Sequence, residues 1–235
     1  MKVENCHIES EEFNNKLARL YSIENQDELS LSDQNFILTC GDDSDSEIRC
    51  RACELLAKFP SLKSEEFLLA RLTDKDSLVR AEACDSISFS CSKSTLKELL
   101  RITNDKAVLV RGYAVLSAAD VQRNLKESST YTVQFLKNME LREKSRWVKI
   151  ALCSALISLG CGEYQSKLIE FIDDKRYQNR CAALTRIREL ISLGMLDDLP
   201  TVERALLARK EKESARSVLD SIDKTIKCIK LNTEI

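Results

Sequence analysis

Few side chains in this sequence have the types and spacing that catalysis needs. The single histidine, His7, would have to carry any Ser/His/Asp or Cys/His catalytic group. The segment Ser90–Lys93 has the S-x-x-K spacing of a nucleophilic serine, but the motifs that accompany it in such enzymes are missing. The sequence also lacks the glycine-rich phosphate loops, the nucleophile elbow and the zinc-protease motif. We therefore expect no catalytic residue and no enzymatic activity.

Metal-ligating residues also lack the spacings that metal sites use. Cys50-x-x-Cys53 is the one C-x-x-C pair, and no second pair follows at the distance of a zinc ribbon. The acidic segment from Gly41 to Glu47 lacks the central glycine and the distal glutamate of a calcium-binding EF-hand loop. We interpret this segment as a helix-capping turn, and we expect neither a metal nor a cofactor.

The composition favours a helical protein. The 235 residues include only 5 glycines and 2 prolines, too few for the many turns of a β-sandwich or a doubly wound sheet. The chain is 43% hydrophobic and carries 36 basic against 38 acidic side chains, a formal net charge of −2. These values exclude disordered, collagen-like and mucin-like chains, and they allow a sizeable core.

The cysteines and the N-terminal segment indicate a reducing compartment. Met1 to His7 lacks the basic and apolar regions of a signal peptide. The longest uncharged, mainly apolar run is Ile150 to Gly162, which is far shorter than the roughly 20 residues of a membrane-spanning helix. We expect a cytoplasmic protein without membrane contact, whose ten cysteines are thiols that pack as small apolar residues.

One pattern recurs along the chain. The segment Ile48–Leu56 is matched by Val79–Ile87 and by Val110–Ala118, and weaker copies lie at Val148–Leu156 and Asn179–Ile187. The basic residues that the copies share are Arg49, Arg80, Arg111, Lys149, Arg180 and, in a degenerate sixth copy, Arg216. They are 31, 31, 38, 31 and 36 positions apart.

Each copy follows a short acidic turn, and a second apolar-periodic stretch such as Leu96–Ile102 precedes that turn. An aspartate in the turn can cap the helix that follows it and complement its N-terminal dipole. Each repeating unit therefore has the order helix, acidic turn, helix.

This pattern resembles the HEAT repeat, especially the short HEAT-like repeats named after phycocyanobilin lyases. The resemblance rests on the acidic turn, the V-R-x-x-A start of the second helix, and apolar residues three, four and seven positions after the arginine. It implies that turn aspartates and helix arginines of successive repeats form a stacked ladder, in which Lys149 could not make the same bidentate bond. The resemblance is specific for architecture and nearly silent about function.

We therefore predict an all-α protein, a right-handed α-α superhelix of the HEAT-like solenoid kind with about six helix pairs. We expect a single solenoid domain over residues 1–235, with an N-terminal helical cap at 1–32, HEAT-like repeats at 33–200, and a degenerate repeat and cap at 201–235.

The resemblance implies that the second helices line a concave face. Helical spacing places positions −2, +2, +5 and +9 from each basic residue on one neighbouring face, which holds six acids, two bases and the only tryptophan. Aromatic anchors in an acidic surround suit a basic protein or peptide. The candidate partner-binding residues are Arg51, Glu54, Glu82, Asp85, Tyr113, Leu116, Asp120 and Trp147. Packing of these residues between repeats is the alternative interpretation.

The two ends of the chain have opposite charge. Residues 1–47 carry 12 acids and 3 bases, whereas residues 204–230 carry 8 bases and 4 acids. These runs are interpreted as the solvated faces of capping helices, with a contact between the basic C-terminal helix and an acidic partner as the alternative.

We predict a non-enzymatic scaffold that binds a protein or peptide, of basic character, through its acidic concave face. One alternative is an immunity-type inhibitor of a basic toxin or nuclease, which the charge pattern alone supports. Another is a HEAT-like alkylpurine DNA glycosylase, whose resemblance implies a basic cleft. The negative balance of this face argues against binding of nucleic acid. The sequence leaves the oligomeric state open.

Overall fold

The computed structural model describes the backbone of residues 2–233 and the side chains of residues 11–232. Every regular element in that part of the chain is a helix, so the all-α prediction is confirmed. Residues up to Asn124 form one compact unit, and residues from Leu125 onward form a second. The side chain of His7 lies outside the described residues.

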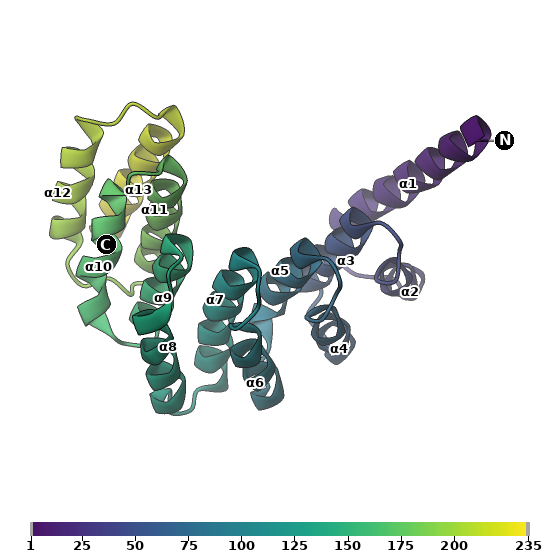
Figure 1. The fold of residues 1–235 in the computed structure, drawn as a ribbon, viewed down its shortest axis with the longest axis horizontal. Coiled ribbons are helices and arrows are strands. Elements are labelled where there is room, and N and C mark those ends of the chain that lie inside the picture. The colour runs from purple at the N-terminus through teal and green to yellow at the C-terminus, as the bar shows by residue number, and fades with distance from the viewer. Residues whose placement is uncertain (1, 234–235) are drawn as a thin grey trace. The chain divides into compact units, whose positions relative to one another are not determined.

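The first unit contains two rows of helices. Figure 1 shows α2, α4 and α6 along one side of this unit and α1, α3, α5 and α7 along the other. Helix α3 packs against both α1 and α5. The elements are α1 Lys2–Glu24, α2 Leu31–Cys40, α3 Ser46–Lys58, α4 Leu62–Arg71, α5 Ser77–Ser86, η1 Ile87–Phe89, α6 Lys93–Ile102 and α7 Val108–Leu125.

The second unit has three further helix pairs. Its second helices again stack on one another, because α11 packs against both α9 and α13. The elements are α8 Thr130–Arg142, α9 Arg146–Ser158, η2 Gly162–Tyr164, α10 Gln165–Glu170, η3 Phe171–Asp173, α11 Tyr177–Ser192, α12 Leu199–Lys210 and α13 Arg216–Thr233. With the three pairs that follow α1 in the first unit, the described part of the chain holds the six pairs that the sequence predicts.

The core positions of the second helices recur with the predicted spacing. In α3, the residues at −1, +3 and +4 from Arg49 are Ile48, Ala52 and Cys53, and each is 0% exposed. The equivalent cysteines Cys84 and Cys153 are also buried. Burial raises the pKa of the Cys153 thiol to about 12, so this group stays neutral and packs as an apolar residue. The cysteines whose side chains the structure describes are all free thiols.

An aspartate at the end of the turn starts two of the second helices. Asp45 and Asp76 are the N-cap residues of α3 and α5, and their carboxylates accept hydrogen bonds from the backbone amides of Glu47 at 2.8 Å and Leu78 at 2.7 Å. These bonds satisfy amides that have no partner inside the helix, and they place negative charge at the positive end of the helix dipole. An acidic N-cap therefore starts α3 and α5, whereas the N-cap of α9 is Ser145 and that of α11 is Arg176, whose side chain makes no capping bond.

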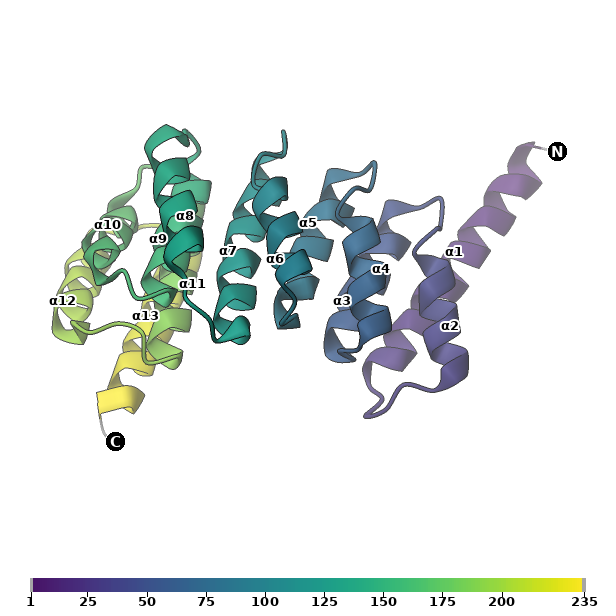
Figure 2. The same cartoon turned by 90° about the horizontal axis from the view of Figure 1, so that it is seen from below.

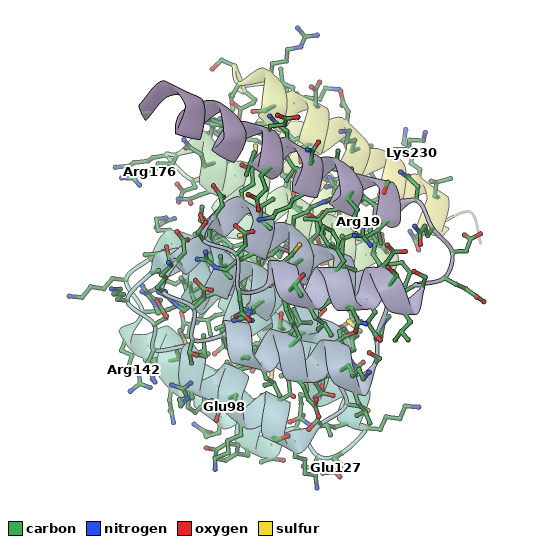
Figure 3. All side chains as sticks on the ribbon, turned by 90° about the vertical axis from the view of Figure 1, so that its right-hand side faces the viewer. Arg19, Glu98, Glu127, Arg142, Arg176 and Lys230 are labelled. Atoms are coloured by element: carbon green, nitrogen blue, oxygen red, sulfur yellow. The ribbon has the colours of Figure 1, made fainter. Side chains whose placement is uncertain are left out.

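Helix α1 packs on α3 as a second helix does on its neighbour. Its Leu20 and Ile23, at +4 and +7 from Lys16, are buried. Figure 2 shows α1 extending past α2 at its N-terminal end. Arg19, labelled in Figure 3, lies over the ring of Phe36 at 4.0 Å from its centroid and so ties α1 to α2. Helix α1 is thus held by the same face that the later second helices bury.

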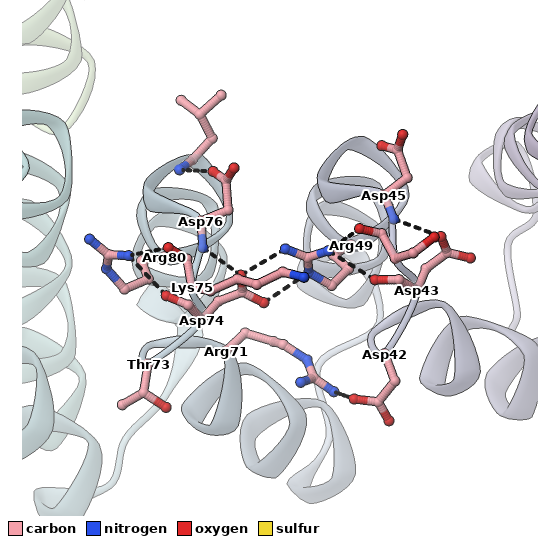
Figure 4. Close-up of polar contacts among 12 residues, drawn as sticks. Asp42, Asp43, Asp45, Arg49, Arg71, Thr73, Asp74, Lys75, Asp76 and Arg80 are labelled. Atoms are coloured by element: carbon pink, nitrogen blue, oxygen red, sulfur yellow. Dashed lines mark hydrogen bonds and ion pairs between the residues drawn. The ribbon is translucent and has the colours of Figure 1, made fainter.

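A ladder of ion pairs joins successive repeats of the first unit, as the resemblance implied (Figure 4). Arg49 donates from Nε and Nη2 to the two carboxylate oxygens of Asp74, at 2.9 Å each. Arg80 makes the same bidentate contact with Asp105, at 2.8 and 2.9 Å. Each arginine also donates from Nη1 to carbonyl oxygens of its own turn, such as Arg49 to Asp43 at 2.9 Å. Lys16 begins the ladder by binding Asp43 at 2.8 Å.

The ladder of the second unit departs from the sequence prediction at two positions. Arg146, three residues before Lys149, binds Asp174 and so fills the ladder position that Lys149 was expected to weaken. Arg180 binds Glu213 bidentately, at 2.7 and 2.8 Å. The turn acid of the sixth repeat is therefore Glu213, and the residue six positions later is Leu219. Arg216 lies only three positions after Glu213, so it does not have the place in the repeat that the basic residues have in the other five copies.

Candidate partner-binding surface

Three carboxylates that the sequence predicts for the binding face come together across α3 and α5. Glu82 is half-buried, and Glu54 of α3 and Asp85 of α5 lie close enough to influence its titration. We call Glu54, Glu82 and Asp85 the acidic α3–α5 surface. Glu54 and Asp85 are exposed, so two of its three carboxylates face solvent directly.

The environment of Glu82 opposes its charge. Burial raises the pKa of this carboxyl, and the neighbouring charge of Asp85 raises it further. A hydrogen bond from the Ser86 hydroxyl, 3.2 Å from Oε1, partly offsets both effects. A cationic group placed here would reverse the balance, because it would pair with a carboxylate that is poorly solvated in the free protein.

Arg51, also predicted for this face, is held by contacts within the chain. It pairs with Glu24 of α1 and with Glu54 of α3, the latter at 2.5 Å, and its guanidinium lies 4.5 Å from the ring centroid of Tyr21. Lys58 binds the other oxygen of Glu24 at 2.5 Å. Arg51 therefore acts as a bridge between α1 and α3 and forms one border of the acidic α3–α5 surface.

Sequence reasoning missed Tyr21 and Glu24. Both lie on α1, which was expected only to cap the chain. The signal that could have found them is the spacing of the ladder, since Lys16 precedes its turn acid Asp43 by 27 residues and Arg49 precedes Asp74 by 25. In that register Tyr21 stands at +5, the position that Glu54 and Asp85 occupy in the next two second helices.

The predicted residues of α7 extend the same face within the first unit. Tyr113 and Leu116 are half-buried, at +2 and +5 from Arg111. Asp120 pairs with Arg123 of the same helix at 2.5 Å. Helix α7 therefore adds an aromatic and an aliphatic side chain to a face whose other members are mainly charged.

Trp147, the remaining predicted residue, lies on α9 in the second unit and is half-buried. The structure thus groups Arg51, Glu54, Glu82 and Asp85 by contact or charge, and places Tyr113, Leu116 and Asp120 at equivalent positions of the following second helix. Trp147 belongs to the separate second unit.

Exposed apolar side chains cluster at the start of two second helices in the first unit. Leu78 on α5 is 58% exposed, and Val108 and Leu109 on α7 are 44% and 38% exposed. They follow the turns that the ladder aligns, so they present apolar area at the same end of successive repeats. Such residues are available for contact with a partner.

Metal-ligating groups do not converge in the part of the chain whose side chains are described. No three histidine, cysteine, aspartate or glutamate side chains there are grouped so as to hold a metal ion. In the same part of the chain, no helix combines the length and apolarity that crossing a membrane requires.

Comparison with known proteins identifies the repeats and the fold. Residues 36–119 match a family model described as HEAT repeats. The solved complex of CpcE and CpcF of phycocyanin lyase from Nostoc sp. PCC7120 includes a chain of similar fold, with a TM-score of 0.58, 14% identity, and coverage of 93% of this chain and 88% of that one. Human deoxyhypusine hydroxylase in complex with glycerol matches with a TM-score of 0.43 and 15% identity, over 90% of this chain and 88% of that one. No curated protein matches the sequence.

Proposed function

Since this chain is a HEAT-like repeat protein, we propose that it is a scaffold that binds a protein partner through the acidic α3–α5 surface. The observation that carries the proposal is the half-buried Glu82, held among the like charges of Asp85 and Glu54. The chemistry is suited to a lysine or arginine side chain of the partner.

Neighbouring side chains favour a polypeptide as the ligand. Tyr21 stands at one border of the surface, and Leu116 of α7 has the equivalent position in the following second helix. Aromatic and aliphatic groups beside carboxylates suit a segment that combines basic and apolar side chains. A phosphate backbone would be repelled by the same carboxylates, so the nucleic-acid enzyme is the weaker candidate.

The fold likeness is compatible with this role. The CpcE and CpcF structure is a complex of two proteins, which supports a protein partner for this chain. Its name is that of a lyase, so catalysis by an assembled complex is the competing function. The immunity-type inhibitor remains a special case of the proposal, in which the basic partner is a toxin or nuclease. We propose a cytoplasmic location.

Affinity capture from native lysate tests the proposal. Wild-type protein is compared with the variant Glu54→Ala/Glu82→Ala/Asp85→Ala. We expect the carboxylate variant to lose at least nine-tenths of one or more captured proteins, and the purified partner to bind wild type with a salt-sensitive affinity. Equal recovery of every protein by wild type and the carboxylate variant would refute the α3–α5 surface as the site.

A control matches the change of charge. Glu66, Glu170 and Asp197 are exposed acids away from the second helices, and their replacement by alanine removes the same three charges. This control should recover the partner as wild type does. Loss of the partner in the control as well would mean that net charge, rather than the acidic α3–α5 surface, governs capture.

A further inference from the structure

The turn acids of the ladder place all six turns in one register. Each accepts a hydrogen bond from the backbone amide two residues later, at distances between 2.7 and 2.9 Å. They are Asp43, Asp74, Asp105, Glu143, Asp174 and Glu213. The residue before each ladder acid and the four residues after it can therefore be compared from turn to turn. We call these five positions the turn edge.

The turn edge of the first repeat is acidic. It contains Asp42, Asp45 and Glu47 and no base. The side chain of Asp42 is 81% exposed, although Arg71 of α4 binds it at 2.9 Å, and Glu47 is exposed as well. Helix α1 brings the carboxylate of Glu12 to this turn. Lys16 of α1 binds both Glu12, at 2.7 Å, and the ladder acid Asp43, at 2.8 Å. The neighbouring Glu11 is exposed.

The turn edges of the second unit have the opposite charge. They hold seven basic residues and one acid, Asp173. The basic residues are Arg142, Lys144, Arg146, Lys175, Arg176, Lys212 and Arg216. Arg142 and Arg176 are exposed and point outward on the same side in Figure 3. Ladder contacts from Arg146 to Asp174 and from Arg180 to Glu213 join the three turns, so the bases of successive turn edges follow one another in a row.

We propose that this basic row binds the acidic first turn edge of a second copy of the same chain. The acidic first turn edge and the basic row are both exposed, and both flank ladder acids. Five ladder acids are paired within the chain, Asp43 with Lys16 and Asp74, Asp105, Asp174 and Glu213 with arginines. Apart from Arg146, which is itself a ladder cation, the exposed charges that flank these acids are the ones that a partner can reach. Association through two different patches is heterologous, and it is expected to depend on ionic strength because the groups lie at the surface.

The arrangement favours a polypeptide over a nucleic acid at the basic row. The side chain of Asp173 is 58% exposed and lies 3.1 Å from Lys212 and 3.4 Å from Arg209, so a carboxylate interrupts the row. A nucleic-acid strand carries a continuous series of phosphates, which this carboxylate would repel. A protein surface can place a base or a hydrogen-bond donor opposite it.

Sedimentation velocity over a concentration series tests the proposal with two charge-reversal variants. The first is Glu11→Lys/Asp42→Lys/Glu47→Lys, which spares the ladder acid Asp43 and the N-cap Asp45. The second is Arg142→Glu/Lys144→Glu/Arg176→Glu. We expect wild type to associate at low salt and to dissociate at about 0.5 M salt. Each variant alone should weaken self-association at least tenfold.

Mixing the two variants makes the test specific, because both the first turn edge and the row are basic in the first variant and both are acidic in the second. The two should form a mixed complex, and a chain carrying all six substitutions should self-associate again. The control Arg204→Glu/Lys224→Glu/Lys227→Glu changes the net charge as the second variant does, but at exposed residues away from the turn edges. It should associate as wild type does.

Several results would overturn the proposal. Wild type that stays monomeric at about 100 µM in low salt has no such contact. Equal weakening by the control would assign the effect to net charge. A monomeric wild type that binds polyuridylate would assign the row to nucleic acid. Circular dichroism of each variant checks that it is folded, and the salt response of wild type decides the proposal even if a variant does not fold.

Discussion

Arg49 and Asp74 join two successive repeats through a bidentate ion pair that is almost completely shielded from solvent. Both hydrogen bonds are 2.9 Å long, and the side chains are 4% and 7% exposed. Burial alone would raise the pKa of Asp74, but the hydrogen bonds from Arg49 and from the amide of Asp76 outweigh it and lower the pKa. The pair therefore sets how α3 and α5 meet, and with them the acidic α3–α5 surface.

Removing one member of this pair should strongly destabilise the first unit. We expect Arg49→Ala to lower the free energy of unfolding by about 3 kcal/mol, because it leaves the Asp74 carboxylate buried without its cation. Arg49→Lys should recover only part of the loss, since lysine cannot make the bidentate contact. Urea denaturation followed by circular dichroism measures both.

A surface pair serves as the control for that prediction. Arg101 and Glu98 are 57% and 41% exposed in their side chains, so Arg101→Ala should change the unfolding free energy by less than about 0.5 kcal/mol. If Arg49→Ala lowered the free energy of unfolding no more than this control does, the ladder contacts would not contribute measurably to stability.

The last ladder acid should make stability depend on acid pH. Burial opposes ionisation of Glu213, but hydrogen bonds from Arg180, the Ala215 amide and Arg209 outweigh it and lower its pKa from 4.5 to about 2. Because the pKa is lower in the folded state, the stabilisation is complete above the ordinary value and is lost as the pH falls toward 2. We expect Glu213→Gln to cost about 2 to 3 kcal/mol at neutral pH.

The difference between wild type and Glu213→Gln should therefore shrink between about pH 4.5 and pH 2. Denaturant titrations at a series of pH values measure this difference. A difference that stays constant over the whole range would show that the glutamate contributes through shape and not through its charge.

Glu82 should behave in the opposite way. Its pKa is raised in the folded state, so folding favours the protonated form and the ionised form opposes stability at neutral pH. Glu82→Gln keeps an acceptor for the Ser86 hydroxyl, and we expect it to raise the unfolding free energy at pH 7 by up to about 1 kcal/mol. The gain should disappear as the pH is lowered and wild-type Glu82 becomes protonated. A loss of stability at pH 7 would contradict the conclusion that ionised Glu82 opposes folding.

Gly41, which follows α2, lies directly against the ring of Phe67 of α4. A Cβ at this position would lie 2.2 Å from Cε2 and 2.5 Å from Cζ of Phe67. Because Phe67 is only 7% exposed, its ring has little room to move, and Gly41→Ala should cost about 1 to 3 kcal/mol. We compare the thermal unfolding of Gly41→Ala with that of Gly160→Ser. At Gly160 a Cβ would meet no atom within 4 Å, but the φ of +91° is unfavourable for a side chain. Wild-type stability in Gly41→Ala would show that the contact can relax.

The repeat pattern was sufficient to predict the fold because its chemistry is local. The V-R-x-x-A-C segment carries its core positions and follows its own turn acid, so a single copy specifies both the buried face and the start of the helix. Ile48, Ala52 and Cys53 are buried as expected for that reason. The face that collects Glu54, Glu82 and Asp85 also follows from helical spacing.

The remaining features depend on contacts between distant segments. Arg146 replaces Lys149 in the ladder because the ion pair requires reach to Asp174 rather than a fixed place in the repeat. The sixth register was misread because the last copy has Leu219 where the others have a base, and Arg216 was the nearest cation. The bridge from Arg51 to Glu24 joins residues 27 positions apart, which only the packing of α1 on α3 brings together.

Site-specific photo-cross-linking at Asp85 tests most directly whether the second helices of the first unit bind a partner. A photoreactive phenylalanine derivative replaces Asp85 on α5 or, as the control, Glu66 on the outer helix α4, both of which are exposed. We predict a discrete protein adduct from position 85 in native lysate, absent at position 66 and suppressed when Glu54 and Glu82 are replaced by alanine. The same adducts from both positions, or none from position 85, would contradict a binding role for the acidic α3–α5 surface.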